Sequence, residues 1–409
     1  MEQLIKYLTF GFLVIFLFSL GCSDNPLQIP QNYDPLQEGD ALQDTVLYAI
    51  QDTTYLIDSV LNTRLSNRLL LGEFKGLTAR PILRFTTLPD SVRFIEAEIQ
   101  FLADGSLSDA NSTPFTAVAY PVLNAWESNI DDVWEDYTRN YDPTTPLGEL
   151  ELSPESTDTL IMKLNPDGLN LFSTWSRVED NDQNPGILID FNNASFIQYF
   201  SSRSNSSFPR LYYQYQALND TSVTILDSVQ ATFDAFIYQV SLPTVPERNY
   251  VSTLTPYNTL VKFDLEGFLN HFSEGVEIVT ANLQFFVDRE HSVLDPLYGP
   301  NLEIRRLLTE IDNSSPSVDS TVSRYLRLQQ WSSDSSYLEV RAGNDRVLLA
   351  RGFVQLQLTD LSQPHGFLVS FINEVDFYSY LAFYNHKHSD VNLRPRLVLR
   401  FQKPAKPRF

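Results

Sequence analysis

The sequence has little of what stabilises small secreted domains or binds nucleic acid. It contains a single cysteine, Cys22, so no internal disulfide can form and packing alone must hold each domain together. Basic residues are in the minority, because 29 Lys and Arg stand against 51 Asp and Glu, for a net charge of −22. A phosphate backbone would be repelled by this charge, and no basic stretch forms a local exception. We therefore expect no nucleic acid partner.

Signatures of known enzyme classes are also missing from the sequence. There is no G-x-S-x-G, H-E-x-x-H, P-loop or G-x-G-x-x-G pattern, and 15 glycines are few for an active site rich in loops. A glycoside hydrolase would need two carboxylates facing each other in a cleft, about 5–10 Å apart. Such a pair has no recognisable spacing in so acidic a chain. We expect a protein without catalytic activity and keep the hydrolase as a third alternative.

The N-terminus carries an apolar run, Tyr7 to Leu20, whose 14 residues are fewer than the roughly 20 that span a bilayer. The run suits the central region of a signal peptide. It ends at Ser19-Leu20-Gly21-Cys22, which resembles the lipobox of bacterial lipoproteins, where cleavage precedes a cysteine that is then acylated. The alternative is an unmodified thiol after an ordinary secretory signal.

This resemblance predicts how the chain begins and where the protein is found. Residues 1–21 are the expected signal peptide, and Cys22 is the expected lipidation site. Residues 22–44, rich in Pro, Gln, Asp and Asn, are the expected flexible tether. Since several acyl chains anchor stably, we expect a lipid-anchored protein of the cell outer membrane, either periplasmic or exposed at the surface.

The remainder of the chain shows an internal duplication. Four short blocks of similar sequence occur twice in the same order: 97–101 with 281–285, 120–126 with 325–331, 186–193 with 366–373, and 209–216 with 395–402. Matching blocks in one order indicate two copies of one structural unit. We place the first module at residues 45–217 and the second at residues 225–404, with residues 218–224 as the join.

Within each module the hydrophobic residues alternate with polar ones, as they do in half-buried strands. Ile99 and Phe101 in the first copy, and Leu283 and Phe285 in the second, share one face of their strands. Clusters of turn residues separate the runs, and helical periodicity is scarce. We therefore predict an all-β fold, with two tandem jelly-roll-like antiparallel β-sandwiches.

The repeated blocks resemble a known family of bacterial and archaeal surface proteins. Residues 260–265, Trp126, Trp331 and the Pro-Arg-Leu triplets at 209–211 and 395–397 are similar to motifs of DNRLRE domains. These disaggregatase-related modules are grouped with carbohydrate-binding modules. The resemblance implies a β-sandwich without catalytic machinery that binds polysaccharide.

The first module contains an insertion, around residues 129–152, that combines aromatic and acidic residues. Aromatic faces stack on sugar rings, and carboxylates accept sugar hydroxyls or bind a hard cation. The alternative is a solvated acidic loop whose rings pack against the sandwich edge, which is the commoner arrangement. Our candidate ligand-binding residues are Trp126, Trp134, Tyr137, Tyr141 and Trp331.

A structural calcium ion is the one cofactor that the acidic loops suggest, and it would be held by oxygen ligands. The candidate metal ligands are Asp131, Asp132, Asp180 and Asp182, although no EF-hand spacing is present and a polar turn is the simpler interpretation. His386 and His388 alternate around a lysine and could face one side of a strand, without a third ligand at a clear spacing.

Two functions of different classes remain from the sequence. The first is a cell-envelope protein that is lipid-anchored in the membrane and binds polysaccharide. The second is a structural or assembly lipoprotein that contacts other envelope proteins and binds no sugar. An aromatic-lined groove would favour the first, and a flat apolar patch would favour the second.

Overall fold

The computed structural model describes residues 42–56, 61–124, 140–177, 184–255, 257–272, 276–295, 301–311, 316–327, 354–355, 358, 366–372 and 375–403. The expected signal peptide and almost all of the expected tether lie outside these residues. None of the helices in the described part of the chain has the length and apolar character that crossing a bilayer needs.

Antiparallel β-strands make up most of the described chain, as the sequence predicts, and the all-β sandwich fold is confirmed. The strands are β1 (Gln43–Leu56), β2 (Arg68–Phe74), β3 (Leu77–Arg84), β4 (Val92–Leu107), β5 (Phe115–Pro121), β6 (Gly148–Leu152), β7 (Thr159–Leu164), β8 (Ile187–Asn192), β9 (Ile197–Ser201), β10 (Arg210–Ala217), β11 (Asp220–Gln230), β12 (Phe233–Val240), β13 (Arg248–Ser252), β14 (Tyr257–Phe263), β15 (Glu277–Gln284), β16 (Val287–Val293), β17 (Asn301–Leu307), β18 (Val318–Arg327), β19 (Gly366–Phe371), β20 (Tyr380–Tyr384) and β21 (Arg396–Gln402). The helices are η1 (Thr63–Leu65), α3 (Pro166–Trp175), α4 (Leu265–Leu269) and η4 (Val391–Leu393).

The strands from β2 to β12 form one sheet, which we call core one. Its order is β11-β10-β4-β7-β6-β5-β8-β3-β2-β9, with β12 beside β3. The long strand β4 pairs with β7 and β10 along its first part and with β9 from Ala103 to Leu107, so the sheet closes on itself. The sequence did not predict this closure, because β4 changes partners within one uninterrupted strand, and no local pattern marks the change. Inside, Phe94 and Phe172 pack edge-to-face with ring centroids 6.3 Å apart.

Core two consists of β1 and the strands from β13 to β21. One sheet has the order β15-β21-β1-β14-β19-β17-β18, and a second has the order β13-β20-β16. Every residue of β19 is buried, which matches its continuous apolar run Phe367 to Val369. Burying a large apolar side chain contributes about 1.5–3 kcal/mol, so these strands supply much of the stability of core two.

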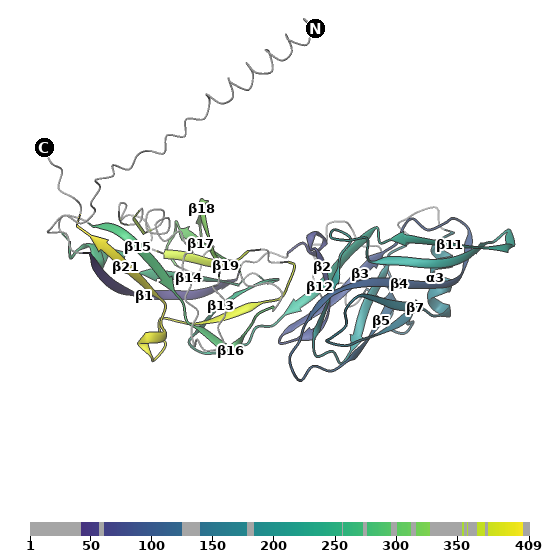
Figure 1. The fold of residues 1–409 in the computed structure, drawn as a ribbon, viewed down its shortest axis with the longest axis horizontal. Coiled ribbons are helices and arrows are strands. Elements are labelled where there is room, and N and C mark those ends of the chain that lie inside the picture. The colour runs from purple at the N-terminus through teal and green to yellow at the C-terminus, as the bar shows by residue number, and fades with distance from the viewer. Residues whose placement is uncertain are drawn as a thin grey trace, which may run out of the picture. The chain divides into compact units, whose positions relative to one another are not determined.

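Two strands belong to a different core from the one that the sequence predicts. β1 lies within the expected first module, yet it pairs with β14 and adjoins β21 in core two. Figure 1 shows this purple strand among the green and yellow strands of core two. Conversely, β12 lies within the expected second module and pairs with β3 of core one. The folded cores therefore divide the chain differently from the ranges 45–217 and 225–404.

The turn between β10 and β11 accounts for this difference. Leu218 and Asn219 join the two strands directly, and β11 pairs with β10 along its length. Because a two-residue connection forces neighbouring strands into a hairpin, β11 cannot leave core one, and β12 follows it there. The expected join at 218–224 is thus the tip of a hairpin.

Matching strand pairs of the two cores have the same register. Gln100 faces Arg210 in core one, and Gln284 faces Arg396 in core two. Likewise Leu83 faces Ile187, and Val261 faces Phe367. The repeated sequence blocks align Gln100 with Gln284, Arg210 with Arg396 and Ile187 with Phe367, so residues that match in sequence also occupy matching places in the sheets.

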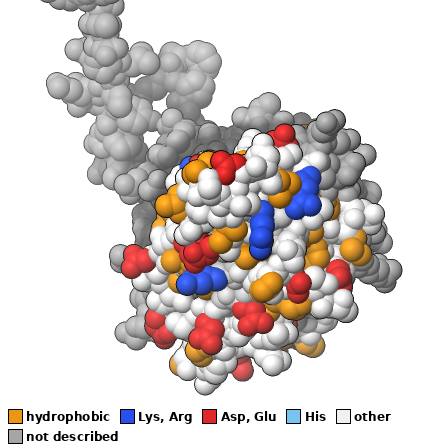
Figure 2. All heavy atoms as spheres, turned by 90° about the vertical axis from the view of Figure 1, so that its right-hand side faces the viewer, with side chains coloured by type: hydrophobic (Ala, Val, Ile, Leu, Met, Phe, Trp, Pro, Cys, Tyr) orange, Lys and Arg blue, Asp and Glu red, His pale blue; other side chains and the backbone are white. Residues whose placement is uncertain are grey.

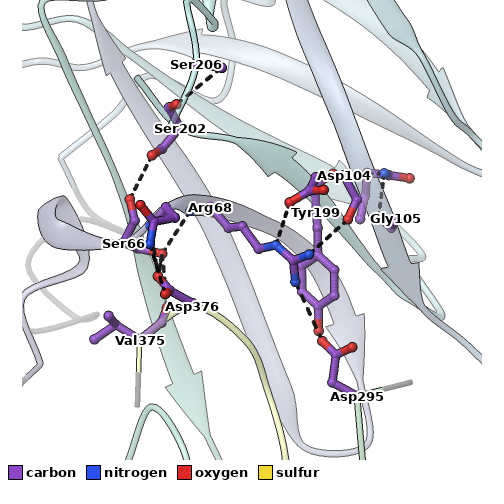
Figure 3. A network of polar contacts seen from close by, with 12 residues as sticks. Ser66, Arg68, Asp104, Gly105, Tyr199, Ser202, Ser206, Asp295, Val375 and Asp376 are labelled. Carbon is purple, nitrogen blue, oxygen red and sulfur yellow. Dashed lines mark hydrogen bonds and ion pairs between the residues drawn. The ribbon is translucent and has the colours of Figure 1, made fainter. Parts of the chain in front are cut away.

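A buried polar network joins β2 of core one to core two (Figure 3). The Arg68 side chain is 3% exposed, and its Nε lies 2.6 Å from Oδ2 of Asp104. Its Nη1 lies 3.9 Å from Oδ2 of Asp295, which follows β16 in core two. Nearby, the carboxylate of Asp376 accepts bonds from Ser66 Oγ and the Asn67 amide, at 3.1 and 2.8 Å.

Buried charges are costly to leave unpaired, so this network fixes the contact between the two cores at Arg68. Burial, together with the charge of Asp295, raises the pKa of Tyr199 well above its ordinary value. Its hydroxyl is therefore protonated, and the ring lies beneath the Arg68 guanidinium at 4.8 Å from the ring centroid.

Candidate functional site

Most of the candidate residues from the sequence lie outside the described residues. These are Cys22, Trp126, Trp134, Tyr137, Trp331, Asp131, Asp132, Asp180 and Asp182. Tyr141, His386 and His388 are described, and the structure shows what each of them contacts.

Tyr141 lies within the insertion, in the part of it that the structure describes. It forms a bridge with Val122, and its hydroxyl donates to Oδ2 of Asp190 at 2.7 Å. Burial is the main cause that raises the pKa of Tyr141 to about 12, and the hydrogen bond to Asp190 adds to it. Asp190 in turn pairs with Arg80. These contacts attach this part of the insertion to the end of β5 and to β8.

The two histidines proposed as metal ligands have different partners. His386 Nδ1 lies 2.7 Å from Oδ1 of Asp52 on β1, whereas the His388 ring packs against Tyr384 with centroids 4.6 Å apart. Among the described residues, no group of three or more His, Cys, Asp or Glu side chains is placed to hold a metal ion.

A groove in core one gathers the side-chain types that bind sugars. It runs along β10 between β4 and β11 and has a volume of about 590 Å³. Its lining residues are Glu96, Ala97, Glu98, Tyr212, Tyr213, Gln214, Leu226, Asp227 and Ser228. We call this surface the β10 groove.

The strand register explains why these residues meet. Tyr212 faces Glu98 on one neighbour and Ser228 on the other, while Gln214 faces Glu96. Because alternate residues of a strand point to opposite faces, Tyr212 and Gln214 point outward while Tyr213 is buried between them. Tyr212 is 37% exposed and therefore offers a ring edge and face to a ligand.

Hydrogen bonds hold the polar side chains of the groove in place. Gln214 Nε2 donates to Oε2 of Glu96 at 3.1 Å, and Gln100 Nε2 donates to Oε1 of Glu98 at 2.7 Å. The Arg210 guanidinium lies 6.0 Å from the centroid of the Tyr212 ring. Each carboxylate keeps further acceptor capacity for a ligand, since an ionised carboxylate accepts about four bonds.

The groove is acidic as well as aromatic. The carboxylates of Glu96 and Glu98 lie beside Tyr212 on this face, whereas on the opposite face of the sheet burial and the charge of Asp227 raise the pKa of Tyr213, whose hydroxyl donates to that carboxylate at 3.4 Å. Figure 2 shows acidic and basic side chains spread over the face of the molecule that it draws, with hydrophobic side chains between them.

Sequence reasoning missed this groove, although part of its signal was visible. The runs Glu96-Ala97-Glu98 and Tyr212-Tyr213-Gln214 alternate, which places Tyr212 on the outward face of its strand. What the sequence lacks is the pairing of β4 with β10 and of β10 with β11, which brings three distant segments together.

Comparison with known proteins adds no assignment. No protein-family model and no curated protein matches the chain. Among solved structures, the structure of the Macrobrachium rosenbergii nodavirus is similar at a TM-score of 0.14 and 6% identity, over 91% of this chain and 93% of that chain. A similarity of this extent carries no argument about fold or function.

Proposed function

We propose that this protein is a lipid-anchored component of the cell envelope that binds polysaccharide in the β10 groove and catalyses no reaction. The observation that carries the proposal is the exposed Tyr212 ring, flanked by Glu98 and by the bonded pair Gln214 and Glu96. Sugar rings stack on aromatic faces, and their hydroxyls donate to carboxylates and accept from amides.

The charge of the groove narrows the class of sugar. Glu96 and Glu98 contribute carboxylates to the groove, the chain as a whole carries a net charge of −22, and the Arg210 guanidinium lies 6.0 Å from the centroid of the Tyr212 ring. Uncharged or amino-substituted sugars suit this field, whereas uronic acids and sulfated sugars do not. The expected ligand is therefore a neutral or cationic polysaccharide.

The arrangement of Glu96 and Glu98 supports binding rather than hydrolysis. Both side chains project from the same strand, on the same side of the groove. Glycoside hydrolysis requires two carboxyl groups that flank the scissile bond from different sides. A ligand in the groove would meet both carboxylates from one direction.

Substitution of Tyr212 tests the proposal. The probes are neutral, amino-substituted and acidic polysaccharides, titrated with the Cys22→Ser chain. We expect Tyr212→Ala to weaken binding about tenfold, because a stacked ring contributes on the order of 1 kcal/mol. Leu65→Ala is the matched control, since Leu65 is 73% exposed and outside the groove. Binding to no polysaccharide, or equal binding by both variants, would refute the proposal.

A second candidate function is protein contact through exposed apolar side chains of β11. Val223 and Ile225 are 55% and 42% exposed, which is high for large apolar side chains. Alternation along β11 directs them away from the face that carries Leu226 and Ser228. For this function, Val223→Lys should release the protein from an envelope complex on a native gel while binding in the β10 groove is unchanged. An unaltered complex would count against it.

A further inference from the structure

Core two is completed by β1, which precedes core one in the chain, whereas the other strands of core two follow core one. In core one, β11 and β12 follow β10 directly and supply the pairing for β10 and β3. In core two, the corresponding neighbours are β21 and β14, and β1 is placed between them. Between β1 and β13 the chain passes through the whole of core one.

The same contacts hold β1 in core two and β12 in core one. Ala49 N donates to Pro395 O at 2.9 Å, and Ala231 N donates to Pro209 O at 2.9 Å. Asp52 then faces Val261, and Asp234 faces Leu83, which are matching positions of β14 and β3. The two cores therefore have equivalent sites that each receive one strand.

Each incoming strand also brings a buried carboxylate to a matching loop. Oδ2 of Asp52 accepts from the backbone N of His386 at 2.7 Å, and Oδ2 of Asp234 accepts from the backbone N of Arg203 at 2.7 Å. The strand site of core two recognises β1 by this bond, by the sheet ladder and by the Asp44–Arg400 ion pair. These contacts define the place that β1 occupies in core two.

We propose that the strand site between β14 and β21 also binds β1 of a second copy of this chain, so that copies join head to tail. The contacts between the two copies would be the same as those that β1 makes within one chain, because neither the strand nor its site changes when β1 comes from a second copy. Whether β1 pairs within its own chain or with a second copy depends on the effective concentration of a chain's own β1, which its connection through core one sets, against the concentration of neighbouring copies. A head-to-tail contact of this kind extends into a linear assembly unless it closes into a ring.

Two single-cysteine chains test this proposal, both carrying Cys22→Ser. One carries Gln51→Cys on β1 and the other Lys262→Cys on β14, and these residues face each other across the strand pair. Facing residues of antiparallel strands have Cα atoms about 4.5–5.5 Å apart, which a disulfide can join. The two chains are mixed at high concentration, passed through mild urea, returned to buffer and oxidised, with a size tag on one of them.

We expect a disulfide-linked heterodimer at several times the yield of a control mixture. The control pairs Gln51→Cys with Leu65→Cys, which is 73% exposed and outside core two, so it reports random collision. A chain carrying both Gln51→Cys and Lys262→Cys should form an internal disulfide at low concentration, which shows that the variants fold. If the double variant crosslinks internally and the mixture gives no more heterodimer than the control, the proposal is wrong.

Discussion

Gly186 lies where a side chain has no room. Its φ is +93°, and a Cβ there would lie 2.3 Å from the carbonyl oxygen of Leu83 on the neighbouring strand. At the matching Gly366 a Cβ would lie 2.9 Å from the carbonyl oxygen of Val261, and the φ of Gly366 is not left-handed. The glycines of the repeated block thus permit β8 and β19 to begin against β3 and β14.

Replacement of Gly186 should therefore destabilise core one. We expect Gly186→Ala to lower the free energy of unfolding by about 2 kcal/mol or more, from the strained φ and the backbone clash. Urea unfolding followed by tryptophan fluorescence measures this. Gly366→Ala is the comparison and should cost less, because the Leu307 side chain beside it can move. Unchanged unfolding of Gly186→Ala would contradict the explanation.

Asp234 makes the stability of the protein depend on pH. Burial raises its pKa to about 6, although the bonds from Arg203 work in the opposite direction. The folded chain therefore binds the proton more tightly than the unfolded chain, whose carboxyl has an ordinary pKa near 3.9. For this group, stability increases as the pH falls through about 6, and the gain is complete below the unfolded pKa.

The change is measurable against a variant that cannot titrate. Between about pH 7 and about pH 5, the wild type should gain about 1 kcal/mol of unfolding free energy relative to Asp234→Asn. Urea titrations of both chains at the two pH values give this difference. A parallel pH response of the two chains would show that Asp234 does not titrate in this window.

At the scale of elements, the placement of β1 in core two and of β12 in core one decides which segments can fold together. A fragment cut at the repeat boundaries, residues 45–217, retains β1 without its partners and lacks β11 and β12. A fragment cut by strand pairing, residues 61–245, contains every strand of core one. Unpaired strand edges expose backbone groups and invite aggregation, so the two fragments should behave differently.

We expect the 61–245 fragment to unfold cooperatively in urea and the 45–217 fragment to aggregate or to lack a transition. The 61–245 fragment loses the contacts of Arg68 with Asp295 and of Ser66 with Asp376, so it should be less stable than the full chain. Circular dichroism and size-exclusion chromatography of both fragments check this. A 45–217 fragment that folds as well as the 61–245 fragment would contradict the assignment of strands to cores.

For the whole molecule, the proposed lipid at Cys22 precedes a segment that continues into β1, and β1 belongs to core two. The net charge of −22 favours solubility of the domains that the anchor would hold. In this arrangement the anchor attaches to core two, while the β10 groove belongs to core one.

Substitution of Cys22 tests the anchor itself. In cells, Cys22→Ser should shift the protein from the membrane fraction to the aqueous fraction and abolish labelling with a fatty acid analogue, because the thiol is the only proposed attachment point. A matched control is Ser23→Ala, which leaves the thiol in place. Membrane retention and labelling of Cys22→Ser would refute lipidation at this residue.

The sequence by itself determined the strand content and the positions that correspond between the two halves, because period-two alternation and repeated blocks are local patterns. It pointed to Tyr141, but the Asp190 bond that occupies its hydroxyl joins residues far apart in the chain. Neither the β10 groove nor the burial of Asp234 has a local signature, since each depends on which strands become neighbours.

Tertiary structure alone decided that β1 completes core two and that β12 completes core one. β1 and β12 match in register and in their buried aspartates, so either strand satisfies the pattern of either core. The two-residue turn after β10 holds β11 and β12 in core one, and the site in core two is filled by β1. Strand pairing depends on contacts between distant segments, and equivalent repeats offer equivalent partners, so local pattern cannot choose between them.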